Sequence, residues 1–204
     1  VAADDSEAGT VARRRCEEKA LRCLARLEYQ NLKPTTDDLE KVLYGWKGKN
    51  NSKRKLASGG VAVERDTFGL VRDLAVTMPT TGVNVWLYPQ LTSLLNWWAR
   101  ENCSPELTWS TFTINNNWCA SAHRDRNSQG PSLITSVGKH VGGRLFTYTD
   151  DVDNDSILIQ DPHGKAVFLN GKNLHKTEKF EGQRTSIIFF ASKFVEAMDD
   201  GTWA

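Results

Sequence analysis

Residues 122–127 of the chain read AHRDRN, and they place a histidine and an aspartate two positions apart, at His123 and Asp125. In an extended segment, residues two apart point to the same side, so this imidazole and this carboxylate can reach the same ion. A His-x-Asp pair by itself is common by chance, and it can equally be two polar residues on a loop. The choice between a metal site and a loop therefore depends on what the rest of the chain supplies.

The remaining members of a metal site follow later in the chain. His175 comes just after the turn-forming sequence NGKN, at the start of a predicted strand, and GQRTSIIFF follows at 182–190. Two histidines and one carboxylate form the facial triad of non-haem Fe(II) oxygenases, which leaves positions open for a co-substrate and O₂. Arg184 begins the next predicted strand and can bind a carboxylate through two parallel hydrogen bonds, and Ser186 shares its face. The sequence thus predicts a three-ligand metal site beside an anion-binding arginine.

The order H-x-D, H and R-x-S is much more specific than any of its parts. It resembles the Fe(II)/2-oxoglutarate-dependent dioxygenases over roughly Trp109–Ser192. The resemblance implies a double-stranded β-helix, or jelly-roll, fold. It also implies that Fe(II) is held at a catalytic centre by His123, Asp125 and His175.

The same resemblance assigns a co-substrate and a reaction. Arg184 and Ser186 would bind the C5 carboxylate of 2-oxoglutarate. The implied reaction is oxidative decarboxylation of 2-oxoglutarate to succinate and CO₂, coupled through O₂ to hydroxylation of a substrate C–H bond, with ascorbate as an expected stimulant. The alternative is a jelly-roll binding module without catalytic activity, such as a cupin-like or sugar-binding domain.

A narrower resemblance concerns residues 115–151, which are similar to the TET/JBP branch of these dioxygenases. That branch oxidises the methyl group of 5-methylpyrimidines (5-methylcytosine or thymine) in nucleic acid. The matching features are Asn127 shortly after Asp125, GPS at 130–132 and GGRL at 142–145. The departures are the lack of a cysteine-rich zinc region, the lack of a second arginine shortly before His123, and Ser192 where a base-contacting histidine is expected. Hydroxylation of a protein side chain or a small molecule is therefore the alternative.

Other residues are weaker candidates for the pocket. If residues 111–125 form one strand, Asn115 and Asn117 share the face of the metal ligands and can contact 2-oxoglutarate or the substrate. Three consecutive asparagines also favour a turn or a bulge, which would change that parity. His140 and His163 lie beside turn residues and are expected to be solvated, although His140 could reach the substrate. Trp118 could stack on a base, but burial in the core is the favoured interpretation.

The periodicity of apolar residues predicts an α+β protein in which N-terminal helices pack against an antiparallel β-unit, and the resemblance implies that this unit is a jelly roll. Helices are expected over 11–30, 33–46 and 90–100. Short strands are expected over 109–119, 133–137, 144–149, 156–160, 166–169 and 186–191. We expect one domain, 1–204, with a mainly helical part at 1–106 and a jelly-roll core at 107–204.

Charge and cysteine content limit the partners. The 204 residues include 26 Lys and Arg against 25 Asp and Glu, a net charge of +1, so a nucleic acid would have to be bound by a local basic patch. The basic run from Lys47 to Lys55 is the candidate, with Lys53, Arg54 and Lys55 as phosphate contacts; a solvated loop is the alternative.

Four cysteines without a C-x-x-C pair are typical of reduced thiols in an intracellular protein, which would be nuclear if the substrate is nucleic acid. No membrane partner is expected, because no apolar run is long enough to cross a bilayer. The chain begins at Val1 and not at Met, so we expect it to be a segment of a longer protein.

Overall fold

A computed structural model of the chain describes residues 6–51, 63–72, 79–125, 128–148, 156–193 and 195. The helices are α1 Glu7–Gln30, α2 Thr36–Leu43, α3 Val83–Leu87 and α4 Pro89–Asn102. The strands are β1 Asn50–Asn51, β2 Val63–Arg72, β3 Pro79–Thr81, β4 Thr111–Asn116, β5 Ser128–Val137, β6 His140–Gly142, β7 Leu145–Tyr148, β8 Ile157–Gln160, β9 Val167–Asn170, β10 His175–Thr177, β11 Phe180–Gly182 and β12 Thr185–Ser192. None of the described helices combines the length and the apolar run that a membrane-spanning helix requires.

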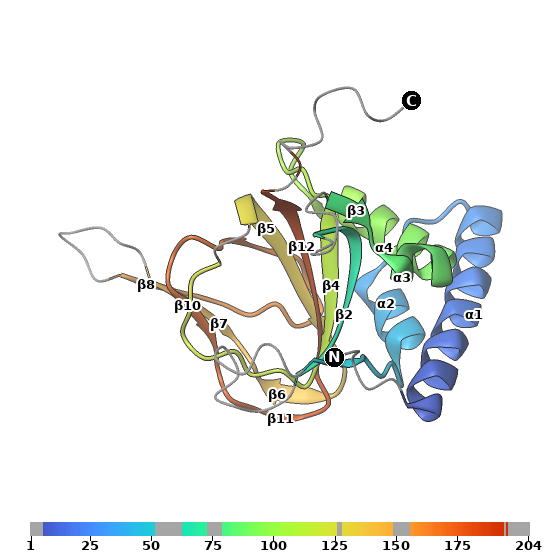
Figure 1. The fold of residues 1–204 in the computed structure, drawn as a ribbon, viewed down its shortest axis with the longest axis horizontal. Helices are drawn as coiled ribbons and strands as arrows, with labels where there is room; N and C mark the ends of the chain where they lie inside the picture. The colour runs from blue at the N-terminus through green and yellow to red at the C-terminus, as the bar shows by residue number, and fades with distance from the viewer. Residues whose placement is uncertain are drawn as a thin grey trace.

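The strands form two antiparallel layers, and the helices cover the outer face of the larger one (Figure 1). The larger sheet has seven strands, in the order β1-β2-β4-β12-β5-β9, with β3 paired to β2. The second layer consists of the small sheets β10-β7-β8 and β11-β6. This arrangement confirms the predicted jelly roll with flanking N-terminal helices.

The helices begin and end where local chemistry dictates. Ser6 caps α1 by accepting a hydrogen bond from the backbone N–H of Gly9, and Asn31 ends the helix in the left-handed region at φ 50°. Thr35 and Asp38 form a reciprocal capping box at the start of α2. These caps agree with the helices predicted from sequence.

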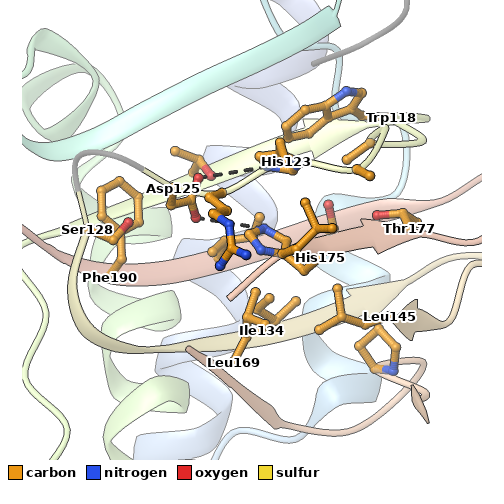
Figure 2. A pocket seen from close by; sticks show the side chains of 18 of the residues that line it. Trp118, His123, Asp125, Ser128, Ile134, Leu145, Leu169, His175, Thr177 and Phe190 are labelled. Carbon is orange, nitrogen blue, oxygen red and sulfur yellow. Dashed lines mark ion pairs between the residues drawn. The ribbon is translucent and has the colours of Figure 1, made fainter. Parts of the chain in front are cut away.

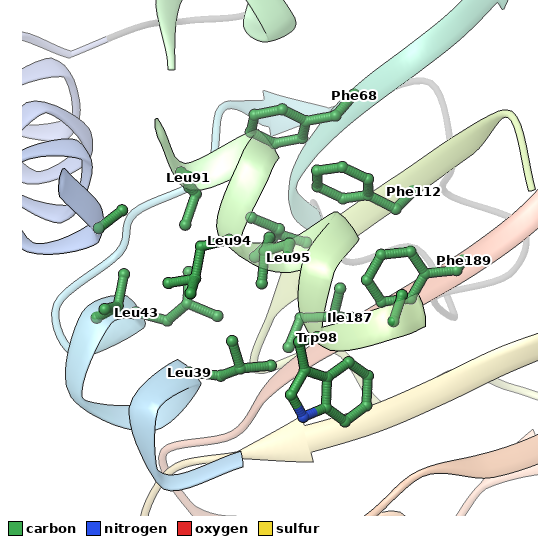
Figure 3. Close-up of a cluster of buried hydrophobic side chains, with 14 of the residues drawn as sticks. Leu39, Leu43, Phe68, Leu91, Leu94, Leu95, Trp98, Phe112, Ile187 and Phe189 are labelled. Atoms are coloured by element: carbon green, nitrogen blue, oxygen red, sulfur yellow. The ribbon is translucent and has the colours of Figure 1, made fainter. Parts of the chain in front are cut away.

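The larger sheet has an apolar outer face. Phe68, Phe112, Phe189 and Leu133 are directly paired across β2, β4, β12 and β5, and all four are fully or almost fully buried. Phe68 and Phe112 are stacked with ring centroids 4.7 Å apart. Figure 3 shows the three phenylalanines beside α4, with Leu95 and Trp98 of that helix next to Phe112 and Phe189. Leu91 and Leu94 of the same helix belong to the same buried cluster and lie on the side of α2. Burial of this row against the helices leaves the opposite face of the sheet to form the inside of the jelly roll.

Strand β2 lies in the part of the chain expected to be mainly helical, and it pairs with β4 in the larger sheet. One expectation about the elements needs correction. The predicted strand 109–119 ends at Asn116, because Asn117 adopts φ 47° and turns the chain. Residues 111–125 are therefore not one strand, and the parity argument that linked Asn117 to His123 fails.

Candidate metal centre and co-substrate cavity

The two histidines of the triad are brought together by backbone pairing. His123 and His175 form an antiparallel bridge, in which each backbone N–H donates to the other residue's carbonyl, at 2.9 and 3.0 Å. The adjacent Asp125 donates its backbone N–H to the carbonyl of Gly171 at 2.7 Å. The segment after β4 is thereby joined to the turn before β10, and all three side chains point to one place (Figure 2).

The side chains of the triad have the separations that a shared ion requires. The ligand atoms of His123, Asp125 and His175 all lie within 4.8 Å of one another. The two Nε2 atoms are 3.8 and 4.0 Å from the oxygens of Asp125, which is too long for hydrogen bonds. The predicted triad is thus assembled in space, with its nitrogen and oxygen atoms facing a common point.

Hydrogen bonds behind the histidines fix their tautomers. His123 Nδ1 is 2.7 Å from the carbonyl of Ser121, and His175 Nδ1 is 2.8 Å from the carbonyl of Asn173. A carbonyl can only accept, so each Nδ1 carries the proton and each Nε2 presents a lone pair. Burial lowers the pKa of His175, which keeps this imidazole neutral near pH 7. Two imidazoles and one carboxylate fit a divalent iron ion well.

The triad lies in the wall of a cavity of about 1020 Å³ between the two layers. Ser186 lines it from β12, Thr113 from β4 and Ile134 from β5, and Arg184 lines it from the position just before β12. Leu145 and Leu169 close the apolar side (Figure 2). The volume is at the upper end of the range for ligand pockets, so it can accept more than a small co-substrate.

Arg184 is a buried cation that needs an anion. Its side chain is only 5% exposed, and burial lowers its pKa to about 10, so the guanidinium remains charged near pH 7. Among the described residues no carboxylate forms an ion pair with it, and its Nε has no hydrogen-bond partner. An uncompensated buried charge costs about 3–5 kcal/mol. A carboxylate ligand in the cavity would remove that cost, and the pairing of Arg184 and Ser186 on one strand face fits the C5 carboxylate of 2-oxoglutarate.

The weaker sequence candidates do not line this cavity. Asn115 is completely buried on the inner face of β4, where it donates to Thr113, and its side-chain oxygen has no partner among the described residues. Asn117 is exposed, and its side-chain oxygen accepts from the backbone N–H of Arg184. Asn117 therefore supports the backbone of the arginine from outside the cavity.

Of the six remaining candidates, two lie within the described residues and four lie outside them. His140 was expected to be solvated but is 8% exposed, with its ring stacked at 4.0 Å on that of the exposed His163. Ser192 is buried at the end of β12 and does not line the cavity. Four predicted substrate contacts lie outside the described residues: Asn127, Lys53, Arg54 and Lys55.

Several residues around the site were not found from the sequence. A Cβ added to Gly171 would lie 2.9 Å from Asp125 Oδ2, and one added to Gly143 would lie 2.9 Å from Arg184 Nε. Both glycines stand in recognised turn sequences, but their contacts depend on distant segments. Arg65 lines the cavity from β2, a strand whose alternating Phe68 and Leu70 were the available signal.

No family model and no curated protein matches the chain. Among solved structures, the chain is similar to an oxidoreductase of the 2OG-Fe(II) oxygenase family from Burkholderia pseudomallei, with a TM-score of 0.51 and 14% identity, over 83% of this chain and 81% of that one. Two further structures have lower scores. They are NgTET1 in complex with 5mC DNA (TM-score 0.45, 14% identity, 78% of this chain and 66% of that one) and OsALKBH1 (TM-score 0.46, 12% identity, 76% and 92%).

The fold and the site define a class. The chain has the fold of the 2-oxoglutarate–Fe(II) oxygenases, as the sequence resemblance predicted. Inside that fold it holds a His-Asp-His cluster and a buried arginine in one cavity.

Proposed function

We propose that this protein is an Fe(II)- and 2-oxoglutarate-dependent dioxygenase that oxidises the methyl group of 5-methylpyrimidines in nucleic acid. The observation that carries the first part is the presence of two complementary sites in one cavity. The Nε2 atoms of His123 and His175 converge with Asp125 at one point. The unpaired cation of Arg184 lines the same cavity. A ligand with a carboxylate at one end and metal-binding oxygens at the other satisfies both.

Each residue has a defined task in this proposal. The iron, when bound, supplies the activation of O₂ that side chains cannot provide. His123, Asp125 and His175 hold it, and the carbonyls of Ser121 and Asn173 keep the imidazoles oriented. Arg184 binds and orients the co-substrate carboxylate, while Ile134, Leu145 and Leu169 exclude water from the reacting end of the cavity.

Three features support a 5-methylpyrimidine as the substrate. The sequence similarity of residues 115–151 to the TET/JBP branch is one. The cavity volume of about 1020 Å³, which leaves room for a nucleobase beside the co-substrate, is another. Trp118 is the third. It is buried to 9% exposure with Val63 and Ala120, as favoured from the sequence, but an edge of it lines the cavity, with its ring 6.1 Å from that of His123, where a base turned out of its helix would contact it.

Nucleoside analysis by mass spectrometry tests the proposal. The protein is incubated with Fe(II), 2-oxoglutarate, ascorbate and methylated DNA, and succinate is measured in parallel. Hydroxymethylated nucleosides together with succinate are the expected result. Succinate formation without any modified base, in DNA or RNA, would exclude the nucleic-acid substrate and favour hydroxylation of a protein or a small molecule. The absence of both metal binding and succinate would leave a binding module.

A further inference from the structure

The opening of the cavity is basic. Arg124 and Lys172 both line the cavity and are both exposed, so they lie at its rim and not in its interior. Arg124 stands between the ligands His123 and Asp125, and Lys172 belongs to the turn just before His175. The two cations therefore flank the metal site on the side where a substrate enters.

Cationic side chains outnumber carboxylates in the lining of the cavity. The lining contains four cationic side chains, Arg65, Arg124, Lys172 and Arg184, and one carboxylate, Asp125. In the proposed function, iron would bind Asp125 and the co-substrate would bind Arg184. Of the two rim cations, Arg124 is also held by contacts within the protein, and Lys172 has no ion-pair partner within the described ranges. Positive charge at a cavity entrance favours substrates that carry negative charge.

The rim is held in a fixed position relative to the triad. Arg124 Nη1 donates to the backbone carbonyl of Lys172 at 2.7 Å, so the guanidinium crosses from one ligand-bearing segment to the other. The neighbouring backbone bond from Asp125 to Gly171, also 2.7 Å, locks the same two segments. An anion bound here would thus be kept at a constant offset from the metal.

We propose that Arg124 and Lys172 form a phosphate-binding rim that holds a backbone phosphate next to the target nucleotide. This proposal rests on the proposed function and specifies how its substrate is held. In a nucleotide, several bonds separate the phosphate from the methyl group on the base. When the methyl group reaches the triad, the phosphate stays at the entrance, where the rim lies. An enzyme that turns a base out of its helix must also hold the adjacent backbone.

Binding of methylated DNA across a salt series tests the rim. Affinity is measured by fluorescence anisotropy with a methylated duplex, for the full chain and for Arg124→Ala/Lys172→Ala. Each lost phosphate contact should reduce the slope of log affinity against log salt by about 0.9, so the double variant should lose nearly 2. Arg124→Lys/Lys172→Arg retains both charges and should keep most of the wild-type slope. The matched control, Lys139→Ala/Lys165→Ala, removes two exposed lysines that do not line the cavity, and its slope should stay unchanged.

The outcomes separate this proposal from the proposed function. An unchanged slope in the rim variant, or an equal loss in the lysine control, would overturn the rim. Wild-type protein that forms succinate with Fe(II) and 2-oxoglutarate but does not bind DNA would also overturn it, while the oxygenase activity would stand. If wild-type protein forms no succinate yet binds DNA with a slope that depends on the rim, the rim is supported and the oxygenase activity fails.

Discussion

At the residue scale, the metal site depends on a glycine as well as on its ligands. Gly171 accepts the backbone hydrogen bond of Asp125, and a Cβ at this position would lie 2.9 Å from Oδ2 and 3.1 Å from Cβ of that aspartate. Gly171→Ala should push the carboxylate away from the two imidazoles and lower the affinity for Mn(II) or Co(II) by about 10–100-fold, as loss of a ligand-orienting contact does. Isothermal titration of the metal measures this.

The control for Gly171 is another turn glycine. Gly164 has φ +70° and open space around its Cβ position, so Gly164→Ala should strain the backbone without touching the triad. It should lower the melting temperature and leave the metal affinity unchanged. Equal metal affinity in Gly171→Ala and wild type would show that Asp125 has room to adjust.

Arg184 should determine the apparent affinity for 2-oxoglutarate. Loss of a hydrogen-bonded charge in a pocket costs about 2–5 kcal/mol, on the order of 30-fold or more in affinity. Arg184→Ala should raise the KM for 2-oxoglutarate accordingly, and Arg184→Lys should restore only part of the loss, because an ammonium group cannot reproduce the planar fork. Succinate formation at varied co-substrate concentration gives the KM. An unchanged KM in Arg184→Ala would remove this residue from the co-substrate site.

The candidate ligands could be predicted from sequence because their chemistry is specific and their order is informative. His123, Asp125 and His175 needed only their residue types and their order along the chain, because the strand expected to carry His123 and Asp125 ends earlier, at Asn116. Gly171 and Gly143 could not be predicted, because what matters is how closely a distant side chain approaches each of them. His140 was misjudged for a related reason: its neighbouring glycines indicate a turn, but burial depends on His163 from another loop.

At the element scale, a buried arginine fastens α1 to the start of α4 and to the loop after α2. Arg13 is 1% exposed and donates to the hydroxyl of Tyr88 at 3.1 Å and to the carbonyl of Lys47 at 2.8 Å. Arg13→Ala leaves both acceptors without this donor, and each unsatisfied acceptor lowers the free energy of unfolding by about 1–3 kcal/mol. Urea unfolding at pH 7 should therefore show that the free energy of unfolding falls by about 2–6 kcal/mol. Arg14→Ala, which removes an exposed arginine of the same helix, should stay within about 0.5 kcal/mol of wild type.

The effect of Arg13 should depend on pH through Asp66. Burial raises the pKa of Asp66, and the charge of Arg13 opposes that rise. When the pKa of a carboxyl group is higher in the folded state than in the unfolded state, the folded protein loses stability as the pH rises through the folded-state pKa. Removal of Arg13 raises this pKa further, so Arg13→Ala should be less destabilising near pH 4, about the unfolded pKa of aspartate, than at pH 7. An equal loss at both pH values would exclude this coupling.

The strands show where sequence patterns are sufficient and where they are not. The alternation of apolar residues in β12 was readable because Ile187 and Phe189 face the helices. The end of β4 could not be read from the sequence, because Asn117 adopts the left-handed region and turns the chain within a continuous polar run. Strand β2 was missed because its buried Asp66 and its cavity-lining Arg65 interrupt the alternation with charges.

At the scale of the whole molecule, the jelly roll was predictable because short strands separated by turn sequences must close into layers to satisfy their edges. The helical cover was predictable from apolar stripes such as that of α4. The sequence could not predict which face of the larger sheet packs against the helices and which lines the cavity. That depends on the register that pairs Phe68 with Phe112 and Phe112 with Phe189.

The two layers should be joined by the metal, and this gives a prediction for the stability of the whole chain. His123 and Asp125 lie on the segment that follows β4 of the larger sheet, whereas His175 lies on β10 of the smaller one. An ion bound only by the folded state at about 100 times its Kd adds about 2.7 kcal/mol. For a chain of this size that corresponds to a rise in Tm of roughly 5–11 °C.

Calorimetry with Mn(II) under nitrogen measures the rise in Tm, and 2-oxoglutarate should add a second rise only when the metal is present. His175→Ala should lose both increments, and Arg184→Ala should lose only the second. A full metal-dependent rise in His175→Ala would place the ion elsewhere, for example at the free cysteines.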